Sequence, residues 1–391
     1  MSDTEIAVRS RAGTGSEVFA YFLRLGCIAF GGPAAHVALM RRELVQQKRW
    51  LSDEQFVDML GVANLVPGPN STEMTMHVGY HRAGWGALWL AGIGFIAPAV
   101  AIVLAFAWAY VRYGDTPAGE GILLGVSPVV LAIIVQAIWG LRFAAFHGAA
   151  TWVVAATVFA AVALGTNEVL ALLGGGLVVL AWRNGVRLGS RVLAVAGLPF
   201  LAPGLQRLSF DTGGGGRTAE LFFVFLKIGA VLYGSGYVLV SFLQADFVDH
   251  RGWLTEQQLL DAVAVGQFTP GPLFTTSTFV GYVVDGWQGA AAATVGIFLP
   301  SFVLVMLTAP LIPRLRRSPW ASAFLDGVNA AALSLMAVTT ISLAQGTLDT
   351  VFTVALFAVA AAVLLRLSPS SVWLILAGAA AGLAHQVVFR G

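Results

Sequence analysis

The stretch VANLVPGPNSTEMTMHVGY at residues 62–80 decides how this chain folds, together with its near copy VGQFTPGPLFTTSTFVGY at residues 265–282. Each stretch is apolar and is interrupted by Pro-Gly-Pro, at 67–69 in the first copy and at 270–272 in the second. Proline has no N–H donor and its ring clashes with the preceding turn, so neither stretch forms one straight helix. Two interpretations follow: a kinked membrane span, or two half-helices that meet inside the membrane as a re-entrant segment. The double proline around a glycine favours the re-entrant segment.

The composition of the whole chain is that of a membrane protein. Of its 391 residues 58% are apolar and only 11% are charged, against about 25% charged in a soluble domain. This excludes a water-soluble enzyme, a disordered chain and a collagen-like one, and it predicts an all-α polytopic membrane protein. The single cysteine, Cys27, excludes an intramolecular disulfide and a cysteine-based metal cluster. The basic residues lie in short loops between apolar runs, which indicates membrane topology rather than nucleic-acid binding.

The second half of the sequence copies the first. A shift of 203 places Arg24 on Lys227 and brings the two Pro-Gly-Pro motifs into register, and a shift of 202 later places Pro98 on Pro300. Two homologous halves with broken helices at matching positions are typical of secondary transporters. The predicted domains are a polar N-terminal tail at 1–16, a first transporter repeat at 17–182, a basic, Gly-rich cytoplasmic linker at 183–219 and a second transporter repeat at 220–391.

The orientation of the two halves depends on how each repeat begins. If 17–39 and 220–243 each cross the membrane as one helix, each repeat has roughly five spans and the halves are inverted repeats. If 17–48 and 220–251 instead bend into hairpins, the halves are parallel. Both arrangements place most lysines and arginines on one side of the membrane, as the positive-inside rule requires. We expect inverted repeats, because 17–39 and 220–243 are long enough to cross.

The candidate binding site is built for an anion. Arg24 and Lys227 lie at equivalent positions inside apolar segments, where a charge is costly and marks function, although a long basic side chain can also reach back to the headgroups. The helices that start after each Pro-Gly-Pro would add free N–H groups and a partial positive charge. The predicted substrate-binding residues are Arg24, Lys227, Gly31, Gly32, Pro33, Gly68, Pro69, Asn70, Ser71, Thr72, Gly234, Ser235, Gly271, Pro272, Thr275 and Thr276.

Titratable residues near these segments are candidates for proton coupling. Glu73 is the main intramembrane acid, and its alternative role is a capping box with Asn70 at a helix start. His36 titrates near neutral pH, and its alternative is a packed core histidine.

Two further acids repeat between the halves. Asp58 and Asp261 follow capping boxes at 52–55 and 255–258. They are either coupling candidates or part of a solvated helix face. Trp50, just before the first box, is predicted to be an anchor at the membrane interface.

The combination of motifs resembles a known family. Phe-Leu-Arg-Leu-Gly at 22–26, Phe-Gly-Gly-Pro at 30–33 with His36, Trp-Leu at 50–51, Pro-Gly-Pro-Asn at 67–70 and Gly-Tyr at 79–80 are similar to the chromate ion transporter (CHR) family in its two-domain form. The matching positions are Arg24, Gly31, Gly32, Pro33, His36, Pro67, Gly68, Pro69 and Asn70. The second half departs from this pattern, with Gly-Ser-Gly at 234–236, Leu239 in place of His36 and Leu273 in place of Asn70.

The resemblance implies a multi-pass protein of the bacterial inner membrane that exports chromate by means of the proton motive force and confers chromate resistance. Sulfate, a tetrahedral dianion of similar size, is an expected competitor. The alternatives are a sulfate or general oxyanion transporter and an anion channel. We expect no enzyme activity, because Ser235 lacks a Gly-x-Ser-Gly context and His-Glu-x-x-His does not occur. The expected partners are chromate, protons and the lipid bilayer, without nucleic acid, cofactor or bound metal, and a homodimer is an open alternative.

Overall fold

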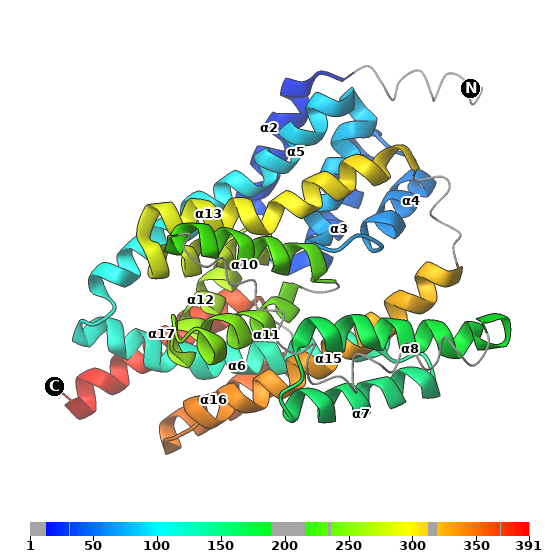
Figure 1. Cartoon of the computed structure of the whole chain (residues 1–391). Helices are drawn as coiled ribbons and strands as arrows, with labels where there is room; N and C mark the ends of the chain where they lie inside the picture. The colour runs from blue at the N-terminus through cyan, green and yellow to red at the C-terminus, as the bar shows by residue number, and fades with distance from the viewer. Residues whose placement is uncertain are drawn as a thin grey trace. The chain divides into compact units, whose positions relative to one another are not determined.

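A computed structural model describes residues 13–30, 32–188, 216–233, 236–311, 319–367 and 369–390, and within these ranges the secondary structure is helical and contains no strand (Figure 1). The chain forms two compact units. Unit 1 comprises Met1–Val111, Gly215–Gly236 and Val265–Arg317, and unit 2 comprises Arg112–Gly214, Tyr237–Ala264 and Ser318–Gly391. Each unit therefore takes segments from both repeats.

The helices of unit 1 come mostly from the beginnings of the two repeats. From the first repeat they are α2 (Gly15–Ile28), α3 (Gly32–Met40), the π-helix η1 (Arg41–Gln47), α4 (Asp53–Ala63) and α5 (Asn70–Tyr113). From the second repeat they are α10 (Arg217–Val231), the end of α12 (Glu256–Phe268), the short helix η5 (Leu273–Thr275), α13 (Thr276–Thr308) and η6 (Ala309–Leu311).

Unit 2 holds the remaining helices. They are α6 (Pro117–Ala145), α7 (Ala149–Ala163), α8 (Glu168–Leu188), η3 (Gly236–Val238), α11 (Leu239–Leu243), the π-helix η4 (Gln244–His250), most of α12, α15 (Pro319–Thr347), α16 (Val351–Leu367) and α17 (Ser371–Arg390).

Several helices are long and apolar enough to cross a membrane. Among the described residues there are five, at Asn70–Tyr113, Pro117–Phe143, Leu273–Thr308, Ser322–Thr347 and Ser371–Val388, and two shorter apolar helices follow at Ala149–Ala163 and Val351–Leu367. A hydrophobic core of this length is what a bilayer about 30 Å thick requires. The protein is a multi-pass membrane protein.

The Pro-Gly-Pro motifs interrupt the helices, as predicted. α4 ends at Ala63 before α5 begins at Asn70, and α12 ends at Phe268 before η5 begins at Leu273. Gly68 has φ +138° and Gly271 has φ +96°, values that glycine adopts far more readily than any residue with a Cβ. The predicted absence of a straight helix is therefore confirmed at both positions, and the re-entrant path, as against a kinked span, stays a prediction.

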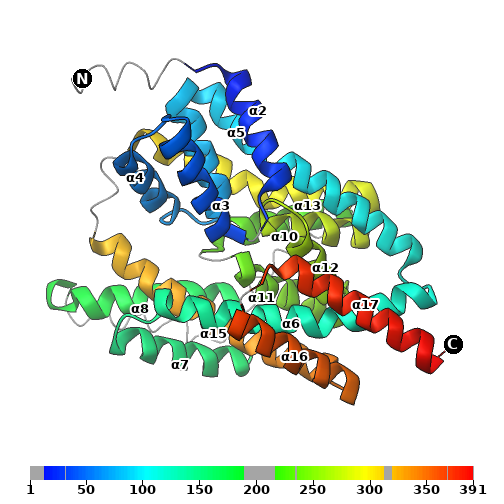
Figure 2. The same ribbon diagram turned by 180° about the vertical axis from the view of Figure 1, so that it is seen from behind.

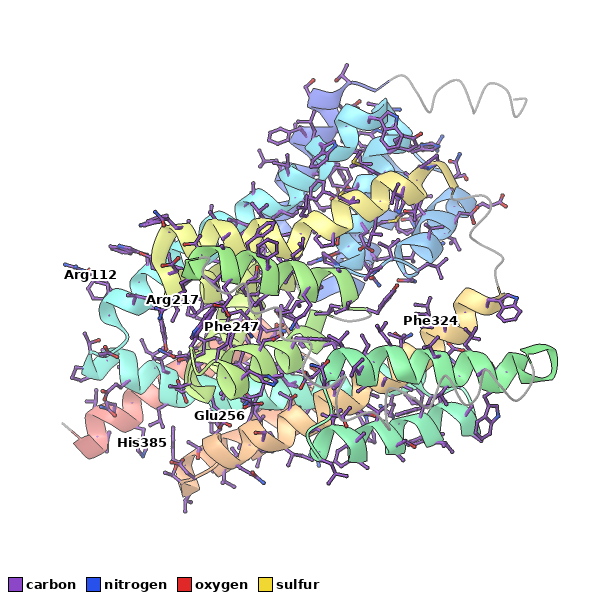
Figure 3. All side chains as sticks on the ribbon, in the orientation of Figure 1. Arg112, Arg217, Phe247, Glu256, Phe324 and His385 are labelled. Atoms are coloured by element: carbon purple, nitrogen blue, oxygen red, sulfur yellow. The ribbon has the colours of Figure 1, made fainter. Side chains whose placement is uncertain are left out.

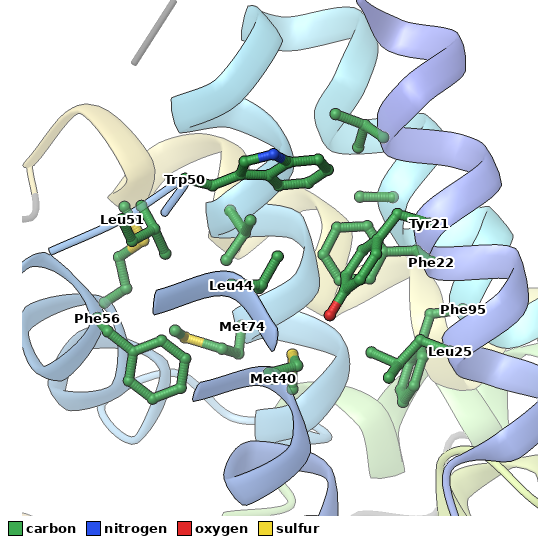
Figure 4. Packing of buried hydrophobic residues seen from close by; sticks show 14 of the residues in the cluster. Tyr21, Phe22, Leu25, Met40, Leu44, Trp50, Leu51, Phe56, Met74 and Phe95 are labelled. Atoms are coloured by element: carbon green, nitrogen blue, oxygen red, sulfur yellow. The ribbon is translucent and has the colours of Figure 1, made fainter. Parts of the chain in front are cut away.

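The start of the first repeat differs from the expectation of a single crossing helix over 17–39. α2 ends at Ile28, and α3 and η1 return along it, so that Arg24 and Glu43 form an ion pair at 3.2 Å. In one straight helix those residues would stand roughly 28 Å apart. Figure 4 shows Tyr21 of α2 close to Trp50, and their ring centroids are 5.2 Å apart. The hairpin of the alternative arrangement is present here, which removes the length argument for inverted halves.

Small residues join helices of different repeats in unit 2. A Cβ placed on Gly125 of α6 would lie 2.7 Å from the Gly382 nitrogen of α17, and Figure 2 shows these two helices side by side. At the equivalent position of the second repeat, Gly327 of α15 packs on Gly176 of α8. The Phe324 ring, on α15 (Figure 3), would lie 2.6 Å from a Cβ placed on Gly176. Close backbone approach through glycine is a usual way for helices to associate in lipid.

Candidate functional site

The two Pro-Gly-Pro breaks are held by reciprocal hydrogen bonds between the repeats. The Gly68 N–H donates to the Leu232 carbonyl at 2.8 Å, and the Gly271 N–H donates to the Ala29 carbonyl at 2.9 Å. Ala29 and Leu232 are the C-caps of α2 and α10, and they occupy equivalent positions in the two repeats. Contacts in which i meets j and j meets i are the signature of a two-fold relation. We call the two motifs, 67–69 and 270–272, the first break and the second break.

The long helix of the opposite repeat packs against the glycine of each break: α13 against Gly68 and α5 against Gly271. A Cβ at Gly68 would overlap Ser301 Oγ of α13 and Glu73 Oε1 of α5, and a Cβ at Gly271 would lie 2.8 Å from the Ala99 Cβ of α5. Ser301 and Ala99 are again equivalent, each following the proline inside its helix. Both positions therefore favour glycine for two reasons: there is no room for a Cβ, and the backbone has a positive φ.

The first break carries a small group of buried polar side chains. Thr72, Glu73 and Ser301 are each fully buried. Among the described residues the Thr72 hydroxyl has no hydrogen-bond partner, and the Ser301 hydroxyl and the Glu73 carboxylate face each other without a hydrogen bond to a third group. Ser301 and Glu73 are neighbours across Gly68, and Tyr233 lies close enough to interact electrostatically with Glu73. Unsatisfied buried polar groups cost about 1–3 kcal/mol each, so a native structure that keeps several together calls for an explanation such as a ligand.

The second break differs, because the hydroxyls of Thr275 and Thr276 are satisfied locally, although Ser277 Oγ in the same turn has no hydrogen-bond partner among the described residues. Thr275 Oγ1 donates to the Pro272 carbonyl at 2.9 Å, and Thr276 Oγ1 donates to the Leu273 carbonyl at 2.8 Å. Thr276 occupies the position of Glu73, and Ala99 the position of Ser301. The two breaks therefore share a backbone arrangement but differ in chemistry.

The capping-box interpretation of Glu73 is wrong. Asn70 directs its amide to Asn64 Oδ1 at 2.7 Å, and the Glu73 carboxylate has no partner on the described backbone. The Pro69 carbonyl accepts the N–H groups of Thr72 at 2.8 Å and Glu73 at 3.1 Å, so Pro69 lies immediately before the helix. Ser71 is buried in the same first turn. Glu73 as a titratable group stays a prediction.

Arg24 has a partner that sequence reasoning missed. Its two terminal nitrogens donate to Glu43, Nη1 to Oε2 at 3.3 Å and Nη2 to Oε1 at 3.2 Å, from a side chain that is 57% exposed onto a carboxylate that is 5% exposed. This pairing reduces the positive field expected from Arg24. An available signal was the repeat itself, because Glu43 falls on Asp246 and both lie in π-helices, η1 and η4. Lys227 is half-buried on α10.

His36 lies in the core of unit 1 rather than at a surface. It is 1% exposed, its Nε2 donates to the Ala29 carbonyl at 2.9 Å, and its ring packs edge-on against Phe95. The same carbonyl accepts the Gly271 N–H, so His36 braces the second break. This geometry favours the packed-histidine interpretation, and a coupling role stays a prediction.

The repeated aspartates sit in different surroundings. Asp58 is half-buried on α4 in unit 1, whereas Asp261 is 1% exposed on α12 in unit 2 and accepts a hydrogen bond from Gln257 Nε2 at 2.9 Å. The solvated-face interpretation is wrong for Asp261. Both predicted capping boxes are confirmed at 52–55 and 255–258. Trp50 is 6% exposed and belongs to the core, so its prediction as an interface anchor is wrong.

Part of the predicted site falls outside the described residues: Gly31, Gly234 and Ser235, and the side chain of Pro33. Gly32 begins α3 with φ +78°. Metal ligands were not expected, and among the described residues no group of three or more His, Cys, Asp or Glu is arranged to hold a metal ion.

Comparison with known proteins adds to this geometry. The family described as Chromate transporter matches residues 16–180 and 219–383, once for each repeat. A chromate transport protein of Cupriavidus metallidurans is 34% identical over 92% of this chain and 90% of its own, and one of Pseudomonas aeruginosa is 36% identical over 86% of this chain and 82% of its own. A probable chromate transport protein of Synechococcus elongatus is 33% identical over 81% of each chain. No solved structure matches.

Two family matches that cover both repeats, and full-length relatives above 30% identity, agree with the motifs around the breaks. The chain belongs to the chromate transporter family.

Proposed function

We propose that this protein exports chromate from the cytoplasm across the bacterial inner membrane, driven by the proton motive force. The observation that carries the proposal is the first break, where the buried Thr72 hydroxyl has no partner among the described residues and the buried Ser301 hydroxyl faces Glu73, beside a helix start. A tetrahedral oxyanion offers acceptor oxygens on every side, and such donors are what it needs. The relatives from Cupriavidus metallidurans and Pseudomonas aeruginosa are named chromate transport proteins, which supports chromate as the cargo.

In this proposal the anion lies between the half-helices that each break separates. The N–H groups at the start of α5, from Asn70 and Ser71, face it from the first repeat, with Gly68 and Pro69 forming the turn. Pro272, Gly271 and the start of η5 contribute the equivalent turn of the second repeat. Irregular backbone at membrane depth is tolerated where it is buried in protein or lines a substrate path.

The electrical part of the proton motive force supports export. Moving one charge across 100 mV is worth about 2.3 kcal/mol, so a dianion that leaves a negative interior gains about 4.6 kcal/mol per 100 mV. That gain sustains a gradient of roughly three orders of magnitude. Uptake of a dianion would have to overcome the same amount.

Glu73 is the proposed coupling residue, in preference to His36, Asp58 and Asp261. Its carboxylate shares the space around Gly68 with Ser301, so an ionised Glu73 would repel a dianion bound there. Binding of the anion and protonation of Glu73 are then linked, and the anion would favour the protonated carboxyl.

The test is flux of radiolabelled chromate into liposomes that contain the purified protein, with the membrane potential and the pH gradient imposed separately. We expect uptake when the potential is positive inside the liposome, because this reproduces the direction of export, and we expect it to saturate with chromate concentration. Flux that does not saturate would indicate an anion channel. Sulfate transported as fast as chromate would make the protein a general oxyanion carrier, and absence of flux for both would contradict the proposal.

A further inference from the structure

Unit 2 contains a cavity that the proposed transport site does not use. Its volume is about 320 Å³, and it is lined by the α7–α8 connection, by α11 and η4, and by α15. The polar side chains in its wall include Glu168, Ser241, Gln244, Asp249, Thr339 and Ser342.

The chemistry of this wall suits a cation. Glu168 and Asp249 are the two acids, and the described lining contains no lysine or arginine. Most of the other polar atoms are hydroxyl and amide oxygens, the donors that hard cations prefer. His250 at the rim donates Nδ1–H to the Ala245 carbonyl at 2.8 Å.

The innermost polar atoms of the cavity lack partners. Ser241 is 2% exposed and Gln244 is 4% exposed, and neither Ser241 Oγ nor Gln244 Oε1 has a hydrogen-bond partner within the described part of the chain. Gln244 Nε2 donates to Asp249 Oδ1 at 3.0 Å. This hydrogen bond sets the orientation of the amide group, and Oε1 is left as an acceptor with no donor among the described residues. Ser241 Oγ and Gln244 Oε1 therefore lie in one cavity wall that also contains two carboxylates, and they are placed to coordinate a positive ion or its water shell.

The backbone at this place is also unusual. Gln244 to His250 form a π-helix, a rare conformation that is frequent at functional sites. The first repeat has its π-helix at the equivalent residues, and there Arg41, in the place of Gln244, pairs with Asp53 at 2.7 Å. The second repeat thus has a neutral amide where the first has a fixed cation.

We propose that this cavity binds a monovalent alkali cation, Na⁺ or K⁺. A tight divalent site needs several carboxylates converging on one point, and no such group of three or more occurs among the described residues. The cavity has room for several waters beside the ion, so the ion keeps part of its hydration shell. This site is independent of the proposed chromate site, which lies in unit 1.

The test is thermal unfolding of the purified full-length protein in choline chloride, NaCl and KCl at equal ionic strength. We expect a saturable rise in Tm of roughly 2–4 °C in Na⁺ or K⁺ over choline. Ser241→Ala and Asp249→Asn should each lose most of that rise. Asp349→Asn is the matched control, because Asp349 is a carboxylate at the start of α16 outside the cavity, and it should keep the rise.

Equal Tm values in all three salts would overturn the proposal, as would a full cation response in the Ser241→Ala protein. If Asp249→Asn lowers folding yield, equilibrium binding of radioactive sodium to the wild type and to Ser241→Ala gives the same decision. None of these readouts requires chromate, so failure here is distinguishable from failure of the proposed transport.

Discussion

The first and the second break have the same backbone and different side chains. Both glycines have positive φ, both donate to the C-cap carbonyl of the opposite repeat, and both press against the long helix of that repeat. Yet the first break has Glu73 and Ser301 where the second has Thr276 and Ala99. Duplication therefore accounts for the scaffold, while the buried acid Glu73 and the serine that faces it occur at the first break and are replaced at the second.

Replacing the two glycines should separate these contributions with the largest effect. Gly68→Ala places a Cβ against both Ser301 and Glu73, and the strained φ adds about 1–3 kcal/mol. We expect transport to fall more than 100-fold. Gly271→Ala meets only the Ala99 methyl at 2.8 Å and should retain more flux. Proteoliposome flux, normalised to protein that elutes as a single species, measures both. Equal losses would show that the backbone alone determines transport at both breaks.

Glu73→Gln, compared with Thr276→Val at the matching position, examines the coupling. A glutamine keeps the shape and cannot ionise, so flux should become independent of the pH gradient while it still responds to the membrane potential. Thr276→Val removes a hydroxyl that serves only its own turn and should leave both responses intact. A Glu73→Gln protein that keeps the full pH-gradient response would remove Glu73 from coupling.

Arg24 and Glu43 require a pair of variants, because either substitution alone leaves a charge without its partner. Arg24→Ala should abolish transport, but the cause is ambiguous, since it also leaves the buried Glu43 carboxylate uncompensated. The double variant Arg24→Ala/Glu43→Gln removes that cost and should recover the Tm. If the recovered protein still transports no chromate, Arg24 acts on the anion; if transport returns, the pair is structural.

Ser301→Ala and Ala99→Ser exchange the side chains of the two breaks. One lost hydrogen bond to the anion is worth about 1 kcal/mol, so Ser301→Ala should raise the KM for chromate roughly five-fold with little change in Tm. Ala99→Ser adds a hydroxyl beside Gly271, where the second break offers no matching acid, and should not lower KM. An unchanged KM in Ser301→Ala would place the anion elsewhere.

The positions of the breaks were predictable from sequence because proline and glycine act locally. The double proline excludes a helix whatever surrounds it, and the duplication marked which glycines correspond. The partners of those glycines were not predictable, because Ser301 and Leu232 approach Gly68 from more than 160 residues away. The hairpin with its turn after Ile28 was considered only as the alternative arrangement for a related reason: 17–39 is mostly apolar and long enough to cross, and hydropathy does not register a bend whose ends pack on each other.

Hydrogen bonds between polar side chains were likewise predictable where they are local in sequence and not where they depend on tertiary packing. The boxes at 52–55 and 255–258 were predicted correctly because each is closed within one turn. Asn70 and Glu73 have a similar spacing, but Asn64 competes for the Asn70 amide, and the sequence does not show that competition. Trp50 and Asp261 were assigned to surfaces by residue type, whereas tertiary packing buries both.

The smallest expected effect concerns His36, whose counterpart is Leu239. His36→Leu makes the first repeat resemble the second and removes one hydrogen bond to the Ala29 carbonyl, which the Gly271 N–H still occupies. The loss of about 1 kcal/mol should lower Tm by a few degrees and leave most of the chromate flux. His36→Gln, which keeps a donor, should restore part of the Tm. A different result would contradict this structural role: both variants are folded, His36→Gln has the Tm of the wild type, and neither flux responds to the pH gradient. In that case the imidazole carries the proton, and the asymmetry of the two breaks extends to a second titratable residue.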